Sequence, residues 1–203
     1  MSKANENKKR KEQTLYNTAF ELFTTKGVQN TAINDIVREA GIGKGTFYLY
    51  FKDKYDILDK LVIRKTSALI KEAVEKTQTE NTQKSIDELL DIIDYIVEYL
   101  NNNKLLLKMI YKNLSWGIYR KVFHNPDAFH NSHSIYQSFS QMIEEENLPI
   151  DNPEITLFLI LELTGSVCYS AIILEEPAPM HVMKPYLFDA IRKLLGDKNL
   201  QKD

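Results

Sequence analysis

Four of the seven glycines in this 203-residue chain lie between residues 27 and 45, and this clustering constrains the fold more than any other feature. The other three glycines and all six prolines are scattered over residues 117–196, and apolar residues recur at helical spacing. The sequence therefore predicts an all-α protein whose first part consists of short helices joined by tight corners.

The N-terminal segment is predicted to form three short helices. A first helix is expected over residues 9–26, and a second after Thr31, which would cap it. A glycine corner at residues 41–43 then leads to a third helix with Phe47 and Phe51 on its inner face. Its outer face carries small, basic and aromatic residues: Lys44, Thr46, Tyr48 and Tyr50.

The rest of the chain is predicted to form a larger helical body. A long fourth helix begins at Asp53 and leads out of the head, and residues 85–101 form the clearest amphipathic helix. Further helices are expected over residues 103–123, 126–147, 153–176 and 180–196, which gives about nine in all. We expect two domains, residues 1–54 and 55–203.

These two parts differ in their balance of basic and acidic side chains. Residues 1–54 carry ten basic and six acidic side chains, whereas residues 55–203 carry sixteen and twenty-two. A basic head in an acidic chain suggests a phosphate-bearing partner for the head.

The single cysteine, Cys168, excludes an internal disulfide and is expected to be buried. With no apolar leader segment, the chain is expected to be cytoplasmic.

The third predicted helix has the features of a helix that enters the DNA major groove. Such a groove is about 12 Å wide and admits one α-helix. Lys44 and Thr46 lie at the amino end, where free amides and the helix dipole attract phosphate, and Gly45 allows a close backbone approach. The same spacing also fits a three-helix corner whose lysines and tyrosines are simply exposed to solvent.

The run TAINDIVREAGIGKGTFYLYFKDK, residues 31–54, resembles the DNA-binding signature of the TetR family. With the upstream segment KGVQNT, the resemblance covers roughly residues 9–60. It implies a helix-turn-helix head, joined by a long helix to a C-terminal effector-binding and dimerisation body. The predicted function is therefore a DNA-binding transcriptional repressor, a homodimer released from a palindromic operator by an unknown small molecule.

The resemblance also assigns DNA contacts to positions of this chain. The positions expected at base edges or the adjoining backbone are Lys44, Gly45, Thr46, Tyr48 and Leu49. Phosphate contacts are expected from Thr31, Asn34, Tyr50 and Lys54, with further charge from Lys8, Lys9, Arg10 and Lys11. Two positions depart from the family pattern: Gly43 replaces a capping Ser, and Ala32 replaces a phosphate-binding Thr.

In the body, the resemblance implies an effector pocket and a two-fold interface. The pocket candidates are aromatic, sulfur-bearing and acidic residues: Tyr95, Tyr99, Met109, Trp116, Tyr119, Tyr136, Phe139, Met142, Glu162 and Tyr169. Glu162 and Glu98 lie in apolar stretches and need a cation, either an effector or a partner across the dimer. The interface is expected on the last two helices, through Gly165, Ser166, Ser170, Ala171, Tyr186, Leu187, Ala190, Ile191, Leu194 and Leu195.

Other functions are disfavoured by what the sequence contains. His124, Asp127, His130 and His133 recur every three residues, but Pro126 interrupts the spacing, so no metal site is predicted. There is no glycine-rich phosphate loop and no nucleophile elbow, so neither an enzyme nor a cofactor is predicted. The alternatives are an activator, a regulator without an effector, and a helical binding protein or enzyme with a purely structural head.

Overall fold

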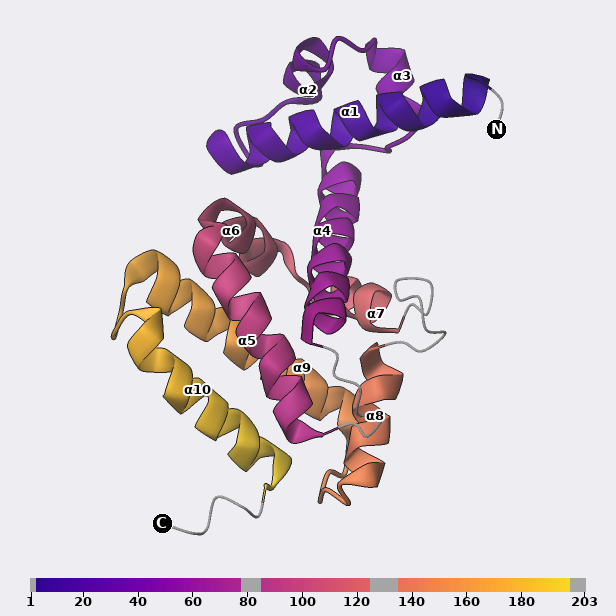
Figure 1. Ribbon diagram of the computed structural model, residues 1–203. Helices are drawn as coiled ribbons and strands as arrows, with labels where there is room; N and C mark the ends of the chain where they lie inside the picture. Colours follow the sequence, from indigo (N-terminus) through magenta and orange to yellow (C-terminus); the bar gives the residue numbers. More distant parts are fainter. Residues whose placement is uncertain (1–2, 78–84, 125–134, 198–203) are drawn as a thin grey trace. The chain divides into compact units, whose positions relative to one another are not determined.

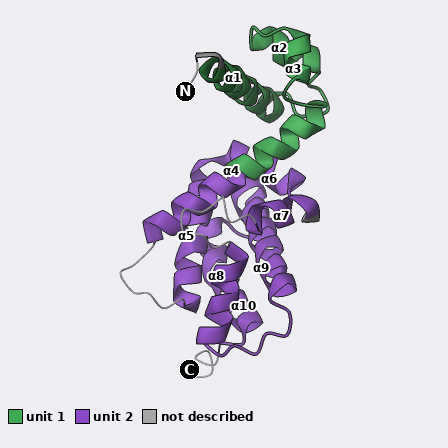
Figure 2. Cartoon of the chain, turned by 90° about the vertical axis from the view of Figure 1, so that its right-hand side faces the viewer, with its two compact units in different colours: residues 1–65 green, residues 66–203 purple. Residues whose placement is uncertain are grey.

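The computed structural model describes residues 3–77, 85–124 and 135–197, and every regular element in these ranges is helical (Figure 1). The all-α prediction is confirmed. The chain separates into two compact units, residues 1–65 and 66–203 (Figure 2). The expected boundary after residue 54 falls at the start of helix α4 (Lys54–Thr77), which continues through the division between the units.

The first unit contains the three helices predicted for the N-terminal segment. They are α1 (Lys3–Thr25), α2 (Ile33–Glu39) and α3 (Lys44–Tyr48), followed by the first turns of α4. Helix α1 begins six residues earlier than predicted, because nothing in its polar N-terminal segment breaks a helix. Gly27, with a φ of 84°, follows its end as expected.

An apolar core holds these short helices together. Phe47 and Phe51 are 0% and 1% exposed, which confirms their predicted inward position. The Phe51 ring meets the Tyr16 ring edge-on, with centroids 5.1 Å apart. Leu15 on α1 and Ile36 on α2 are also fully buried, so each of the first three helices contributes a side chain to this core.

Asp53 caps α4 as predicted. Its carboxylate accepts hydrogen bonds from the backbone N–H groups of Tyr55, at 2.8 Å, and Asp56, at 2.9 Å. These amides have no partner within the helix, so the cap fixes the point where α4 begins.

The second unit is a helical bundle around α9. Its helices are α5 (Ile86–Asn102), α6 (Lys104–Asn113), α7 (Trp116–Phe123), α8 (Ile135–Glu145), α9 (Pro153–Cys168), the π-helical η2 (Tyr169–Leu174) and α10 (Met180–Leu195). Helix α9 packs against α5, α6, α8 and α10. Cys168 at its end is fully buried, and this burial raises the pKa of the thiol to about 12.

Two predicted helices of the body are interrupted. The helix expected over residues 103–123 divides into α6 and α7, because Leu114 is extended and the Asn113 amide donates to the Met109 carbonyl at 2.7 Å. The helix expected over residues 153–176 passes from α to π geometry at Tyr169. The described residues therefore contain ten α-helices rather than about nine. Residues 126–134 of a further predicted helix lie outside the described part of the chain.

Ion pairs attach α10 to α5 along one side. Lys184 pairs with Asp94 at 2.7 Å and with Glu98, and Arg192 pairs with Asp87. Burial disfavours the charged form of Lys184, but hydrogen bonds to the two carboxylates outweigh it and raise the pKa of its ammonium. Glu98 thus has its cation within the same chain, which corrects the expectation of an effector or a bridge across a dimer.

One segment among the described residues, Pro153–Leu174, is long and apolar enough to cross a membrane by length and composition alone. Core helices of soluble proteins meet the same criterion. Here the segment packs against four other helices of its own unit and exposes Glu162.

Candidate nucleic-acid interface

Helix α3 presents a free outer face because its inner face is anchored. It begins after Gly43, whose carbonyl accepts the N–H groups of Thr46, at 2.9 Å, and Phe47, at 3.3 Å. Phe47 is buried, whereas Tyr48 is 51% exposed and Leu49, directly after the helix, is 79% exposed. A large apolar side chain with most of its surface in water is a candidate contact for another molecule.

The beginning of α2 differs from the prediction. Thr31 is fully buried, and its hydroxyl donates to the Gly27 carbonyl at 2.8 Å. The N-cap residue is instead Ala32, which has no capping side chain. The Asp35 carboxylate accepts the Ala32 N–H at 3.1 Å, and this bond, assisted by Arg38, lowers the pKa of Asp35. The expectation that Thr31 caps α2 and binds phosphate is therefore wrong, because its hydroxyl is turned inward.

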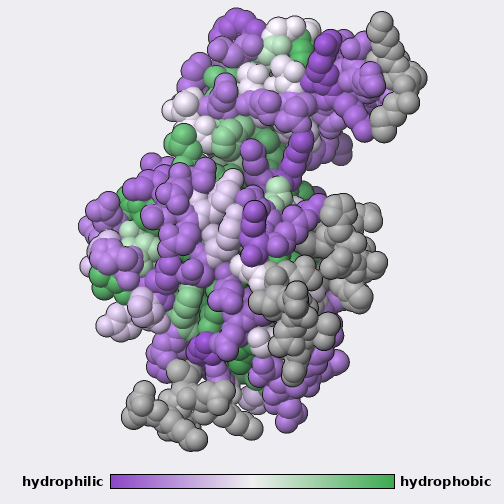
Figure 3. All heavy atoms as spheres, viewed as in Figure 1, coloured by the Kyte–Doolittle hydropathy of each residue, from purple (hydrophilic) through white to green (hydrophobic). Residues whose placement is uncertain are grey.

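The remaining phosphate candidate of α2, Asn34, is exposed. The four basic residues at positions 8–11 are also exposed, and they lie within α1 rather than on an arm that precedes it. Hydrophilic residues cover most of the face seen in Figure 3.

Tyr50 and Lys54, the other expected phosphate contacts, both bind main-chain carbonyls. The Tyr50 hydroxyl donates to the Lys8 carbonyl at 3.2 Å. The Lys54 ammonium donates to the carbonyls of Val28, at 2.9 Å, and Thr31, at 3.2 Å. These contacts tie the ends of the helix-turn-helix to α1 and α4.

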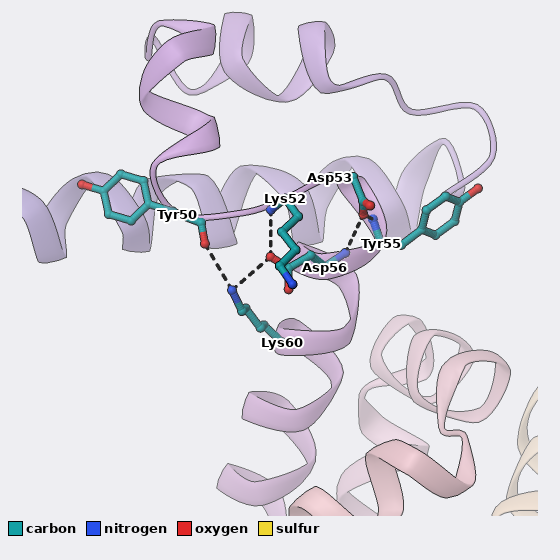
Figure 4. A network of polar contacts seen from close by, with 6 residues as sticks. All are labelled: Tyr50, Lys52, Asp53, Tyr55, Asp56 and Lys60. Carbon is teal, nitrogen blue, oxygen red and sulfur yellow. Dashed lines mark hydrogen bonds and ion pairs between the residues drawn. The ribbon is translucent and has the colours of Figure 1, made fainter.

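A polar network joins the segment that follows α3 to α4 (Figure 4). Lys60 donates to the Tyr50 carbonyl at 3.1 Å and pairs with Asp56 at 3.0 Å, and Asp56 also accepts the Lys52 N–H at 2.9 Å. Burial of the Asp56 carboxyl favours its neutral form, but the bonds from Lys52 and Lys60 outweigh burial and lower its pKa.

Sequence reasoning missed the basic stripe of α4 that packs on aromatic rings of the head. Lys60 lies over the Phe51 ring at 5.1 Å and Arg64 over the Tyr16 ring at 5.1 Å. Arg64 also donates to the side chain of Gln13. Their spacing of four residues on one helix was visible in the sequence, but the rings come from α1 and from the segment between α3 and α4, so no local pattern revealed the contact.

The aromatic residues expected in the effector pocket take part in three sets of contacts. Tyr95 and Tyr99 are stacked, with centroids 6.5 Å apart, and Tyr95 donates to Glu72 at 2.7 Å. Tyr169 stacks on Tyr111 at 4.5 Å. A third group joins α7, α8 and α9 through Tyr119, Phe123, Phe158, His124, Tyr136 and Glu154.

The other pocket candidates are of two kinds. Met109, Phe139 and Met142 are buried in the body core. Glu162 is exposed on α9, and its place in an effector pocket stays a prediction. The Trp116 side chain lies outside the described part of the chain.

The histidine cluster is only partly described. His124 contacts Glu154 at 3.2 Å, whereas Asp127, His130 and His133 lie outside the described residues. Among the residues that the structure describes, no three His, Cys, Asp or Glu side chains form a group that could hold a metal.

Six large apolar side chains are exposed on α9, η2 and α10, three elements that pack against one another. They are called the apolar face and are Ile155, Leu159, Leu174, Val182, Tyr186 and Leu194. Four residues expected at the interface are buried within their own chain instead: Ala171, Leu187, Ile191 and Leu195. The sequence pattern identified the apolar stripe of α10 but not which side of it faces the body, because both sides carry apolar residues.

Comparisons with known proteins agree with this architecture. Residues 15–61 match the bacterial regulatory proteins of the tetR family. An HTH-type transcriptional regulator of Staphylococcus aureus (strain USA300) is 31% identical over 144 residues, which span 67% of this chain and 74% of that protein. The chain belongs to the TetR family of transcriptional regulators. The DNA-binding regulator predicted from the sequence is thereby confirmed.

Solved structures share the fold of this TetR-family chain. A putative tetR family regulator from Shewanella sp. PV-4 has a TM-score of 0.69 at 16% identity, covering 91% of this chain and 95% of its own. FadR from Bacillus subtilis, in complex with stearoyl-CoA, has a TM-score of 0.65 at 17% identity, covering 89% and 97%. At these identities the likeness concerns the fold alone.

The Asp56 network predicts a pH dependence of stability. Because the folded pKa of Asp56 lies below its ordinary value of 3.8, its contribution is present above that pH and is lost as the pH falls through the folded pKa. Asp56→Asn should lower the free energy of unfolding by about 1 kcal/mol at neutral pH, and the difference from wild type should shrink below about pH 4. Denaturant titrations over this pH range measure it. Asp59→Asn, an exposed change on the same helix, should show no such pattern.

Substitution of Gly45 should affect the stability of the fold and the affinity for DNA in opposite directions. A Cβ atom built at Gly45 meets nothing within 4 Å, so the fold itself has room for alanine. Gly45→Ala should raise the free energy of unfolding by about 0.5–1 kcal/mol while weakening DNA binding, because the methyl group would lie where the backbone is predicted to approach DNA. Gly117→Ala, an equally open site on α7, should stabilise without affecting binding. Unchanged DNA affinity in Gly45→Ala would contradict the close approach.

Proposed function

We propose that this regulator is a homodimeric repressor that binds a palindromic operator and leaves it when a small molecule binds the body. The observation that carries the proposal is the anchored helix α3, with Phe47 fully buried and Tyr48 and Leu49 largely exposed. Anchoring fixes the direction of the outer face, and a fixed face is needed to read bases in a groove.

The proposed DNA contacts come from α2 and α3. The positions proposed to meet base edges or the adjoining backbone are Lys44, Gly45, Thr46, Tyr48 and Leu49. A phosphate contact is proposed for exposed Asn34 on α2, with the basic residues 8–11 of α1 adding charge. The amino end of α3 carries no acidic residue in its first turn, which favours phosphate there.

The apolar face of α9, η2 and α10 supports a two-fold dimer. Six large apolar side chains on this face are between 37% and 69% exposed. Such a group on a protein surface is usually covered by another molecule, and a second copy gives closed two-fold pairing. Two heads about 34–36 Å apart would then read the two halves of a palindrome.

Release by an effector requires two states of the dimer with different ligand affinities. A hundredfold loss of operator affinity needs about 2.7 kcal/mol of differential binding, which a small molecule can supply. The aromatic groups of the body and the stearoyl-CoA complex of the structurally similar FadR support a lipophilic effector.

We place this activity in the cytoplasm, where the DNA is, and assign no catalytic step to the chain.

The DNA proposal is tested by selecting binding sites from random duplexes with the purified protein. Lys44→Gln and Thr46→Val should change which bases are selected, because these side chains are proposed to meet base edges. If a dimer neutralises about eight phosphates, log K should fall with log salt with a slope of about −7. Failure to select any sequence, or identical preferences in both variants, would contradict the assignment.

The dimer is tested by a charge placed on the apolar face. Tyr186→Glu should halve the mass measured by light scattering and weaken binding to a palindromic site, because burial of an unpaired carboxylate is unfavourable. The matched control is Leu105→Glu, which alters an exposed apolar residue of α6 that is not among the six residues of this face. A Tyr186→Glu variant that keeps the wild-type mass would exclude this face as the interface.

A further inference from the structure

Lys54, the first residue of α4, directs its ammonium at three carbonyl oxygens. Its Nζ lies 2.9 Å from the carbonyl of Val28, 3.2 Å from that of Thr31 and 3.4 Å from that of Gln29. A lysine ammonium has three N–H donors and no acceptor. Each donor therefore has a main-chain partner in the turn between α1 and α2.

This turn needs donors from outside itself. The last carbonyls of a helix have no partner within it, and Gly27 reverses the chain there with a φ of 84°. The buried Thr31 hydroxyl binds the Gly27 carbonyl at 2.8 Å, and Lys54 binds the carbonyls that follow. Together the two side chains hold the turn in one conformation.

The position of α3 depends on this turn. Helix α2 begins directly after it, and α3 follows α2 through the corner at Gly41, where the Ile42 N–H donates to the Val37 carbonyl at 2.9 Å. At the far end of the recognition segment, Lys60 donates to the Tyr50 carbonyl at 3.1 Å. Two lysines of α4 thus hold the main chain before and after the helix-turn-helix.

We propose that Lys54 is a positioning residue for DNA recognition, which fixes the α1–α2 turn to α4 and so orients α3, and that it is not a phosphate contact. A compact ammonium suits this role, because three carbonyls converge on one nitrogen. Arginine keeps the charge but spreads its donors over a planar fork, so it cannot replace lysine at such a point. At a phosphate contact on the surface, by contrast, arginine is an effective substitute.

The variant Lys54→Arg therefore distinguishes a residue that positions α3 from a residue that contacts phosphate. The full-length protein is compared with its variants for thermal unfolding and for binding to a random-sequence duplex over a series of salt concentrations. Lys54→Arg and Lys54→Met should both lower the unfolding midpoint and weaken binding by about tenfold, because hydrogen bonds to a charged group are lost in each. The slope of log K against log salt should stay at the wild-type value.

Two control variants give the comparison. Lys9→Gln, at one of the exposed α1 positions proposed to add charge toward phosphate, should keep the unfolding midpoint and reduce the size of the slope by about 0.9 for each phosphate that the variant no longer neutralises. Lys52→Met makes the same substitution at an exposed lysine two residues away and should keep the unfolding midpoint. If Lys54→Arg fails to fold despite its retained charge, that result also supports the positioning role.

The proposal is overturned by either of two results. One is wild-type binding and stability in Lys54→Arg. The other is a Lys54→Met variant that keeps the wild-type midpoint but has the reduced slope expected of Lys9→Gln. Neither result would affect the assignment of α3 as the recognition helix, because that rests on the burial of Phe47 and the exposure of its outer face.

Discussion

The burial of Phe47 and Phe51 is the interaction on which the head depends. Helix α3 has five residues and no side-chain cap, and a helix of that length is not stable alone in water. Its conformation must therefore come from the two aromatic rings packed in the core beneath it. Since both rings take up the inner face, the outer face makes no contribution to the core. That surface can carry residues chosen for another molecule at little cost in stability.

Helix α4 has a double role that follows from its hydrogen bonds. Its first two turns bind main-chain carbonyls of the head through Lys54 and Lys60, and its second half belongs to the other compact unit. The helix is continuous from Lys54 to Thr77, so a rotation of its second half would be carried into its first turns. Backbone carbonyls are better attachment points than side chains for this purpose, because they cannot change rotamer.

The sequence predicted the parts of the structure that depend on local pattern. Helix periodicity and glycine corners located α2 and α3, and Asp53 identified the start of α4. The predictions that were wrong concern residues whose conformation depends on tertiary contacts. Thr31 has the right chemistry for a cap, but its hydroxyl binds the turn behind it. Leu114 ends α6 although neither glycine nor proline marks the site, because a side-chain amide competes for the backbone there.

Functional residues were harder to predict than helices, because an outward position does not say what a side chain binds. The expected phosphate contacts Tyr50 and Lys54 lie at the surface of the head, as a sequence pattern suggests, yet both direct their donors at carbonyls. Apolar residues give the opposite case. Leu49 on the head and Tyr186 on α10 are exposed although water solvates them poorly, and nothing in their own unit covers most of their surface. A polar group at the surface can thus be satisfied by its own chain, whereas a large apolar one left in water indicates a partner more directly.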